Sequence, residues 1–186
     1  MYKLKVISST VRPGRKGPIV AAWILEVARQ YGGFEVELLD LGEVNLPMMN
    51  ETKHPSLKQY EHEYTKKWSS VIDEADAFIF VTAEYDNNYP APLRNALEYL
   101  VQEWAYKPAG IVSYGGISAG TRAALNLRTD LAFFKTVPIT EAVNFPFFDQ
   151  FINEQGELVA NDTSKKAAAK MLDELVKWTK ALKTMR

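Results

Sequence analysis

The chain has 186 residues, a formal net charge of −1, two histidines and no cysteine. This length suits one domain with a substantial core, so we expect residues 1–186 to form a single domain. Without cysteine, disulfides, thiolate metal sites and thiol catalysis are excluded, and two histidines eight residues apart make no metal site. The nearly neutral charge indicates no nucleic-acid partner. The alternating N-terminus and short apolar runs predict a cytoplasmic protein with no membrane partner.

Hydrophobic periodicity predicts strands that alternate with helices along the chain. Strands are expected over residues 2–8, 34–39, 76–82, 109–114 and 137–143, and helices over 18–31, 57–72, 93–104, 121–134 and 168–182. This alternation indicates an α/β fold, a parallel sheet with helices on both faces. Five strands favour the flavodoxin-like order 2-1-3-4-5, in which ligands bind beyond the carboxyl ends of the strands. That rule singles out the loops after the first, third and fourth strands.

The loop after the first strand is rich in groups that bind phosphate. It holds three hydroxyls and three cations, Ser8, Ser9, Thr10, Arg12, Arg15 and Lys16. A helix begins directly afterwards, at Gly17-Pro18, and a helix N-terminus offers free N–H groups and a positive dipole end. The segment therefore predicts a phosphate cradle, although a solvated basic turn is the alternative for this stretch alone.

The loops after the third and fourth strands have different compositions. Residues 83–96 combine amides, aromatics and prolines, which suits a flat heteroaromatic ring or, more simply, a turn that starts a helix. Residues 113–122 contain two adjacent glycines, which allow a ligand to approach the backbone or serve a turn that needs positive φ.

These three segments resemble the motifs of the NADPH-dependent FMN reductases, the flavodoxin-like group that includes quinone, azo and chromate reductases. Residues 9–17 are similar to the phosphate loop of that family. Residues 84–96 are similar to its Pro-Glu-Tyr-Asn-x-x-x-Pro stretch and the following helix, and residues 114–122 to its Gly-Gly-x-Ser-x-Gly-x-Arg turn. The resemblance spans about residues 2–135.

The resemblance implies an FMN site made of three groups of residues. The phosphate would be held by Ser9, Arg12, Arg15, Gly17 and the N–H of Ile19. The ring would be bordered on one side by Glu84, Tyr85, Asp86, Asn87 and Asn88, and on the other by Tyr114, Gly115, Gly116 and Ser118. No catalytic side chain and no metal are expected, because the chemistry would take place on the flavin.

The resemblance also implies the reaction and the assembly. NADPH or NADH would act as co-substrate, and a small electron acceptor such as a quinone, azo compound, flavin or metal oxyanion would follow it in a ping-pong sequence. The family forms homodimers or homotetramers with flavin sites near the interface. Several aromatic residues are candidates for that interface or for ordinary core, namely Trp104, Tyr106, Phe145, Phe147 and Phe148.

The chain departs from the family pattern at three positions. Val11 is an extra residue before Arg12, Ala83 replaces a proline, and Asp86 replaces an asparagine. An ionised Asp86 cannot donate a hydrogen bond to the ring, and its charge would lower the flavin potential unless the side chain turns to solvent.

Other classes of protein are weighed on the same residues. Gly116–Gly120 matches a hydrolase nucleophile elbow, but no histidine follows His62, and a hydrolase of that order needs one. The sequence lacks the Gly-x-Gly-x-x-Gly of NAD-binding Rossmann folds and the Gly-Lys-Ser/Thr of P-loops. A non-enzymatic FMN-binding electron carrier or redox sensor stays open as the alternative to an enzyme.

Overall fold

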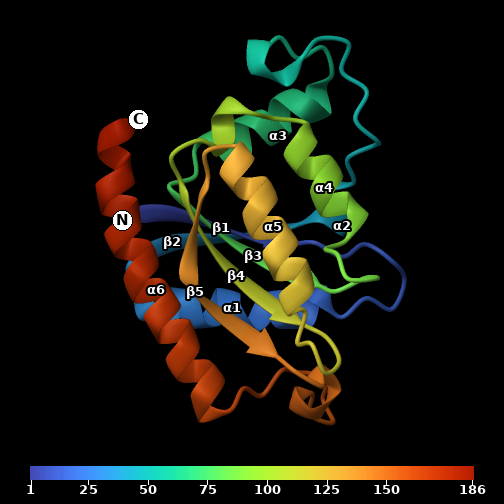
Figure 1. The fold of residues 1–186 in the computed structure, drawn as a ribbon, viewed down its shortest axis with the longest axis vertical. Helices are drawn as coiled ribbons and strands as arrows, with labels where there is room; N and C mark the ends of the chain where they lie inside the picture. The colour runs from blue at the N-terminus through green and yellow to red at the C-terminus, as the bar shows by residue number, and fades with distance from the viewer.

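The computed structural model describes all residues, 1–186, and contains one five-stranded sheet. The strands are β1 (Tyr2–Ser8), β2 (Phe34–Asp40), β3 (Ala77–Ala83), β4 (Pro108–Tyr114) and β5 (Val137–Phe145). Their order is β2-β1-β3-β4-β5, and every neighbouring pair is parallel (Figure 1). The predicted flavodoxin-like topology is therefore confirmed.

Six α-helices connect or flank these strands (Figure 1). They are α1 (Gly17–Tyr31), α2 (Leu41–Val44), α3 (Glu63–Asp73), α4 (Ala91–Glu98), α5 (Thr121–Phe133) and α6 (Asp162–Leu182). None of them combines the length and the apolar character that crossing a bilayer requires.

The sheet separates two hydrophobic cores because successive residues of a strand point to opposite faces. In β3, Ile79 and Val81 pack with α1 and α6, whereas Phe78 and Phe80 pack with α3, α4 and α5. All residues of β3 are buried, since the strand lies in the middle of the sheet with helices on both sides. The expected arrangement of helices on both faces is confirmed.

Two predicted helices are shorter than the periodicity indicates. The helix expected from residue 57 begins at Glu63, because Pro55–Leu57 forms a 3-10 turn that ends at Lys58 with φ +50°. The helix expected to reach residue 104 ends at Glu98. There the indole N–H of Trp104 donates to the carbonyl of Leu97 at 3.2 Å, which satisfies a carbonyl that the next helical turn would have used. Apolar spacing thus continues where the helix does not, because these side chains enter the core from loops.

The aromatic residues considered for an interface include both core residues and an exposed residue. Trp104 and Phe145 are completely buried within their own chain and belong to the core. Phe147 is exposed, at the turn that follows β5.

Candidate functional site

Three consecutive buried hydroxyls lie at the end of the first strand, of which Ser8 is the last residue. Ser8, Ser9 and Thr10 are each 0% exposed, and none of their side-chain oxygens has a hydrogen-bond partner. A buried hydroxyl without a partner costs free energy, so proteins seldom keep even one without a function. Three in a row at the carboxyl end of a central strand indicate a ligand that accepts hydrogen bonds.

The glycine that starts α1 keeps the space between these hydroxyls open. A Cβ atom at Gly17 would collide with the Thr10 hydroxyl and lie 3.0 Å from Ser8 Oγ and 3.3 Å from Tyr114 Oη. Hydroxyls from β1 and β4 therefore converge on the N-terminus of α1, where the helix dipole favours an anion. Burial raises the pKa of Tyr114 to about 12, so its phenol stays protonated and can donate. This donor set fits a phosphate group.

The N–H of Ile19 is already engaged. It donates to the carbonyl of Lys16 at 3.1 Å, and the Ile19 side chain lines a hollow beside α1. The N–H expected at the phosphate is thus part of the first helical turn rather than a free donor.

A tight turn directs the two arginines of the loop to different places. Residues 12–15 form a turn closed by a backbone hydrogen bond of 3.2 Å from Arg15 to Arg12, with Pro13 second and Gly14 third at φ +70°. This is the pattern of a type II turn. Arg12 Nε donates to the hydroxyl of Tyr85 at 3.1 Å. Arg15 instead points towards the end of β2, where it pairs with Asp40 at 2.8 Å.

The segment after β3 is a two-residue hairpin. Tyr85 and Asn88 exchange two backbone hydrogen bonds of 2.8 and 2.9 Å. Asp86 and Asn87 lie between them at φ +49° and +67°, as in a type I′ turn, which Asp and Asn both tolerate. Asp86 is exposed at the tip, the arrangement in which its charge acts least on a bound ring.

An ion pair joins the loops after β3 and β4. Glu84 lies 3.0 Å from Arg122 Nη1 and also accepts from the Arg122 backbone N–H at 3.2 Å. Burial alone would raise the pKa of Glu84, but hydrogen bonds with Ser118 and Arg122 outweigh it and lower that pKa. The histidines have other neighbours, since His54 contacts Ser56 and His62 stacks on Tyr64. No described contact supports a catalytic serine.

The glycines after β4 have distinct functions. Gly120 has φ +75°, and a Cβ there would lie within 2.9 Å of Tyr114 backbone atoms, so this position needs glycine for the turn. Gly115 and Gly116 do not have positive φ. A Cβ at Gly116 would meet no atom within 4 Å. Open space beside Gly116 favours the interpretation that a ligand approaches the backbone here.

These loops enclose a cavity of about 310 Å³ at the carboxyl edge of the sheet. Its lining includes the predicted residues Arg12, Glu84, Tyr85, Tyr114 and Gly115. Phe148 and Asp149 also line it, and the sequence did not assign either residue to the cofactor. They lie at the cavity because the N–H groups of Phe147 and Phe148 donate to the carbonyls of Gly116 and Gly115, at 2.9 and 3.1 Å. No motif marks this segment, so only a family alignment could have indicated it.

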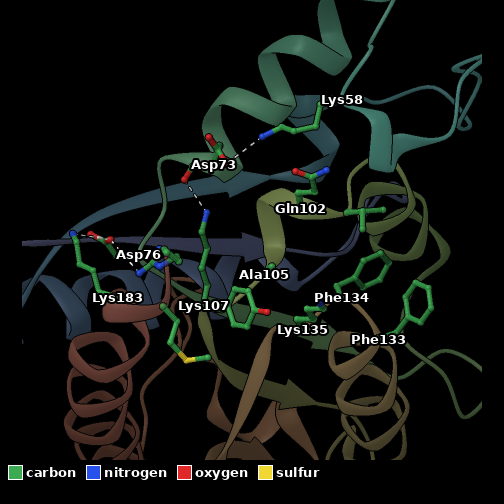
Figure 2. A pocket seen from close by; sticks show the side chains of 14 residues that line it. Lys58, Asp73, Asp76, Gln102, Ala105, Lys107, Phe133, Phe134, Lys135 and Lys183 are labelled. Carbon is green, nitrogen blue, oxygen red and sulfur yellow. Dashed lines mark hydrogen bonds and ion pairs between the residues drawn. The ribbon is translucent and has the colours of Figure 1, made fainter.

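A larger cavity of about 700 Å³ lies at the opposite, amino edge of the sheet (Figure 2). Asp76 and Lys107, which directly precede β3 and β4, are among its lining residues. Its cations have local partners: Lys107 Nζ donates to the Ile72 and Asp73 carbonyls at 2.7 and 2.8 Å, and Lys183 pairs with Asp76 at 2.9 Å. Lys107 thus complements the C-terminus of α3, and the Lys183–Asp76 pair is a local ion pair.

The parallel sheet, its strand order and the phosphate loop after β1 define a flavodoxin-like α/β protein. Solved structures agree: a flavoenzyme NAD(P)H:(acceptor) oxidoreductase from Paracoccus denitrificans superposes with a TM-score of 0.79 over 97% of this chain and 98% of that one, at 22% identity. The NADPH-dependent FMN reductase family matches residues 2–150. The chain belongs to this family.

Curated relatives support the assignment. An NAD(P)H-dependent FMN reductase of Schizosaccharomyces pombe is 39% identical over 148 residues, which cover 77% of this chain and 74% of that protein. An NADPH azoreductase of a Bacillus species is 33% identical over 125 residues, 67% of this chain and 65% of that protein. The protein is thus an oxidoreductase of the FMN type with NAD(P)H as co-substrate, as the sequence predicted.

Proposed function

We propose that this protein transfers electrons from NAD(P)H to small acceptors, namely quinones, azo compounds, flavins or metal oxyanions, in a ping-pong sequence. FMN, when bound, supplies the ring that takes a hydride and passes electrons on. The observation that carries the proposal is the pair of buried, unpartnered hydroxyls of Ser8 and Thr10 beside Gly17, near a cavity between the loops after β3 and β4. The azoreductase among the relatives supports the acceptor class.

The phosphate of FMN would be held by hydroxyl donors at the end of β1 and the start of α1. Ser8 and Thr10 would donate from beside Gly17, Ser9 would add the contact that the family resemblance implies, and Arg12 would supply the positive charge from the rim. Arg12 is suited to this because its side chain is exposed and its one hydrogen-bond partner is a hydroxyl, that of Tyr85. A phosphate dianion attracts the guanidinium more strongly than a phenol does.

The ring would lie between the hairpin of residues 84–88 and the turn of residues 114–118. Both segments offer backbone groups, and the Glu84–Arg122 ion pair joins the hairpin to the first turn of α5, which follows the turn of residues 114–118. What the protein contributes is then position: a slot that binds the ring and leaves one face for the two substrates in turn.

We also propose that the protein forms homodimers or homotetramers. Leu125 and Phe133 on the outer side of α5 are 65% and 79% exposed, and such apolar side chains on one helix favour self-association. Residues of α5 lie close to the site, since Asn126 donates to the Asn87 carbonyl at 3.1 Å. An interface over α5 would therefore border the cofactor.

The test is a titration with FMN followed by steady-state turnover. Purified protein should bind FMN at a ratio of one per chain, and NADPH oxidation should continue over many turnovers with a quinone present. Binding without turnover would instead favour the electron carrier or redox sensor that the sequence left open. Failure to bind FMN, or any other phosphorylated flavin, would overturn the proposal.

A further inference from the structure

The end of β2 forms a binding site for the Arg15 side chain, called the seat of Arg15 below. Arg15 Nη1 donates to both carboxylate oxygens of Asp40, at 2.8 and 2.9 Å, and to the carbonyl of Thr10 at 3.2 Å. Asp40 is only 7% exposed and also accepts the N–H of Gly42 at 2.9 Å. The guanidinium covers Gly42 so closely that a Cβ there would lie 2.8 Å from Arg15 Cζ. A carboxylate, a carbonyl and a bare glycine thus form a fitted site for one guanidinium.

This seat is linked directly to the phosphate cradle through Thr10. Arg15 holds the Thr10 carbonyl, and the Thr10 hydroxyl is one of the three buried groups without a partner. Arg15 also ends the turn that begins at Arg12, so a fixed Arg15 fixes the place from which Arg12 leaves the loop. Residues 11–14, between Thr10 and Arg15, are exposed. The loop would lose its main tie to the sheet without this seat.

The charges also indicate different functions for Arg15 and Arg12. Asp40 neutralises Arg15, which leaves Arg12, Lys16 and the dipole of α1 as the net positive charge at the cradle. If the guanidinium left, the largely buried Asp40 carboxylate would keep the Gly42 N–H but lose its only opposite charge, and that is costly. Arg15 is therefore better suited to hold the loop than to move to a ligand.

We propose that Asp40 and Arg15 are a positioning pair that presents Thr10 and Arg12 to the phosphate, and that Arg15 is not itself a phosphate ligand. This inference rests on the proposed FMN site. It replaces the contact between Arg15 and phosphate that the family resemblance implies, and it adds Asp40, a residue that no motif of the sequence indicates.

The experiment uses three single variants of the full chain, the double variant of Asp40 and Arg15, and one control. Asp40→Asn and Arg15→Gln remove one partner each, and Gly42→Ala displaces the guanidinium without changing any charge. Arg29→Gln, at the far end of α1, removes a cation away from the site. Two quantities are measured: the Kd for FMN, from quenching of flavin fluorescence, and amide hydrogen exchange of residues 10–17 in the protein without FMN.

The sign of the Asp40→Asn effect decides between the two functions of Arg15. For a positioning pair, all three variants weaken FMN about tenfold or more, the loss of roughly one charge-assisted contact. Amide exchange of residues 10–17 becomes faster in all three single variants, and the control changes neither quantity. The double variant of Asp40 and Arg15 binds FMN no more weakly than Arg15→Gln does. For a direct ligand, Asp40→Asn removes a negative charge and releases Arg15, so FMN binds more tightly.

Tighter or unchanged binding in Asp40→Asn, or unchanged exchange in Gly42→Ala, would overturn the inference. The exchange measurement does not need FMN. If the wild-type chain failed to bind FMN, the proposed function would fail, whereas the effect of the pair on the loop would still be measured.

Discussion

The cradle around Gly17 allows a sharp prediction, because the substitution Gly17→Ala fills it with one methyl group. The added Cβ would collide with the Thr10 hydroxyl and approach Ser8 Oγ to 3.0 Å. The phosphate would then lose at least two charge-assisted hydrogen bonds, each worth about 1.5–3 kcal/mol. That sum of about 3–6 kcal/mol corresponds to a Kd for FMN raised about 10²- to 10⁴-fold.

The assay compares FMN with riboflavin, which lacks the phosphate. Gly17→Ala should weaken FMN strongly and leave riboflavin binding nearly unchanged, because the ring slot is formed by other loops. Gly110→Ala is the matched control, since its Cβ would press against Met171 under α6, away from the cradle. That control should lower the melting temperature without changing the ratio of the two affinities. Wild-type FMN affinity in Gly17→Ala would refute the assignment of the cradle.

Three further predictions follow from the same structure. Thr10→Val removes an unpartnered hydroxyl, so chemical denaturation without FMN should show a protein that is equally stable or about 1 kcal/mol more stable. The Kd for FMN should rise about tenfold. A clear loss of apoprotein stability would contradict this prediction. Burial lowers the pKa of Lys107 to about 8, whereas in the unfolded chain this side chain keeps its proton up to its ordinary pKa of 10.5. The free energy of unfolding of the wild type should therefore rise between pH 8 and 10.5 relative to that of Lys107→Met. A difference between the two proteins that does not change with pH would exclude this linkage. Phe133→Asp should shift the proposed oligomer towards monomer in size-exclusion chromatography, and an unchanged elution volume would contradict an interface over α5. Glu98→Lys, at the exposed last residue of α4, is the charged control.

Much of the fold was predictable because its signals are local. A buried central strand such as β3 reads as a continuous apolar run, and the regular exchange of strands and helices leaves few parallel topologies. The prediction failed at the ends of two helices. Trp104 keeps helical spacing with Leu97 but reaches the core from a separate 3-10 turn, and periodicity alone cannot distinguish the two.

For the site, too, some features were predictable from the local sequence and others depend on tertiary contacts. The sequence alone placed the phosphate loop, the hairpin and the glycine turn at one edge of the sheet, since the carboxyl ends of parallel strands meet there. The tertiary structure decided which side chains face the ligand. Arg12 and Arg15 are equivalent in the sequence, yet a turn of four residues sends one to Tyr85 and the other to Asp40, 25 positions away. Such a choice depends on partners that only folding brings together, and so does the arrival of Phe148 at the cavity.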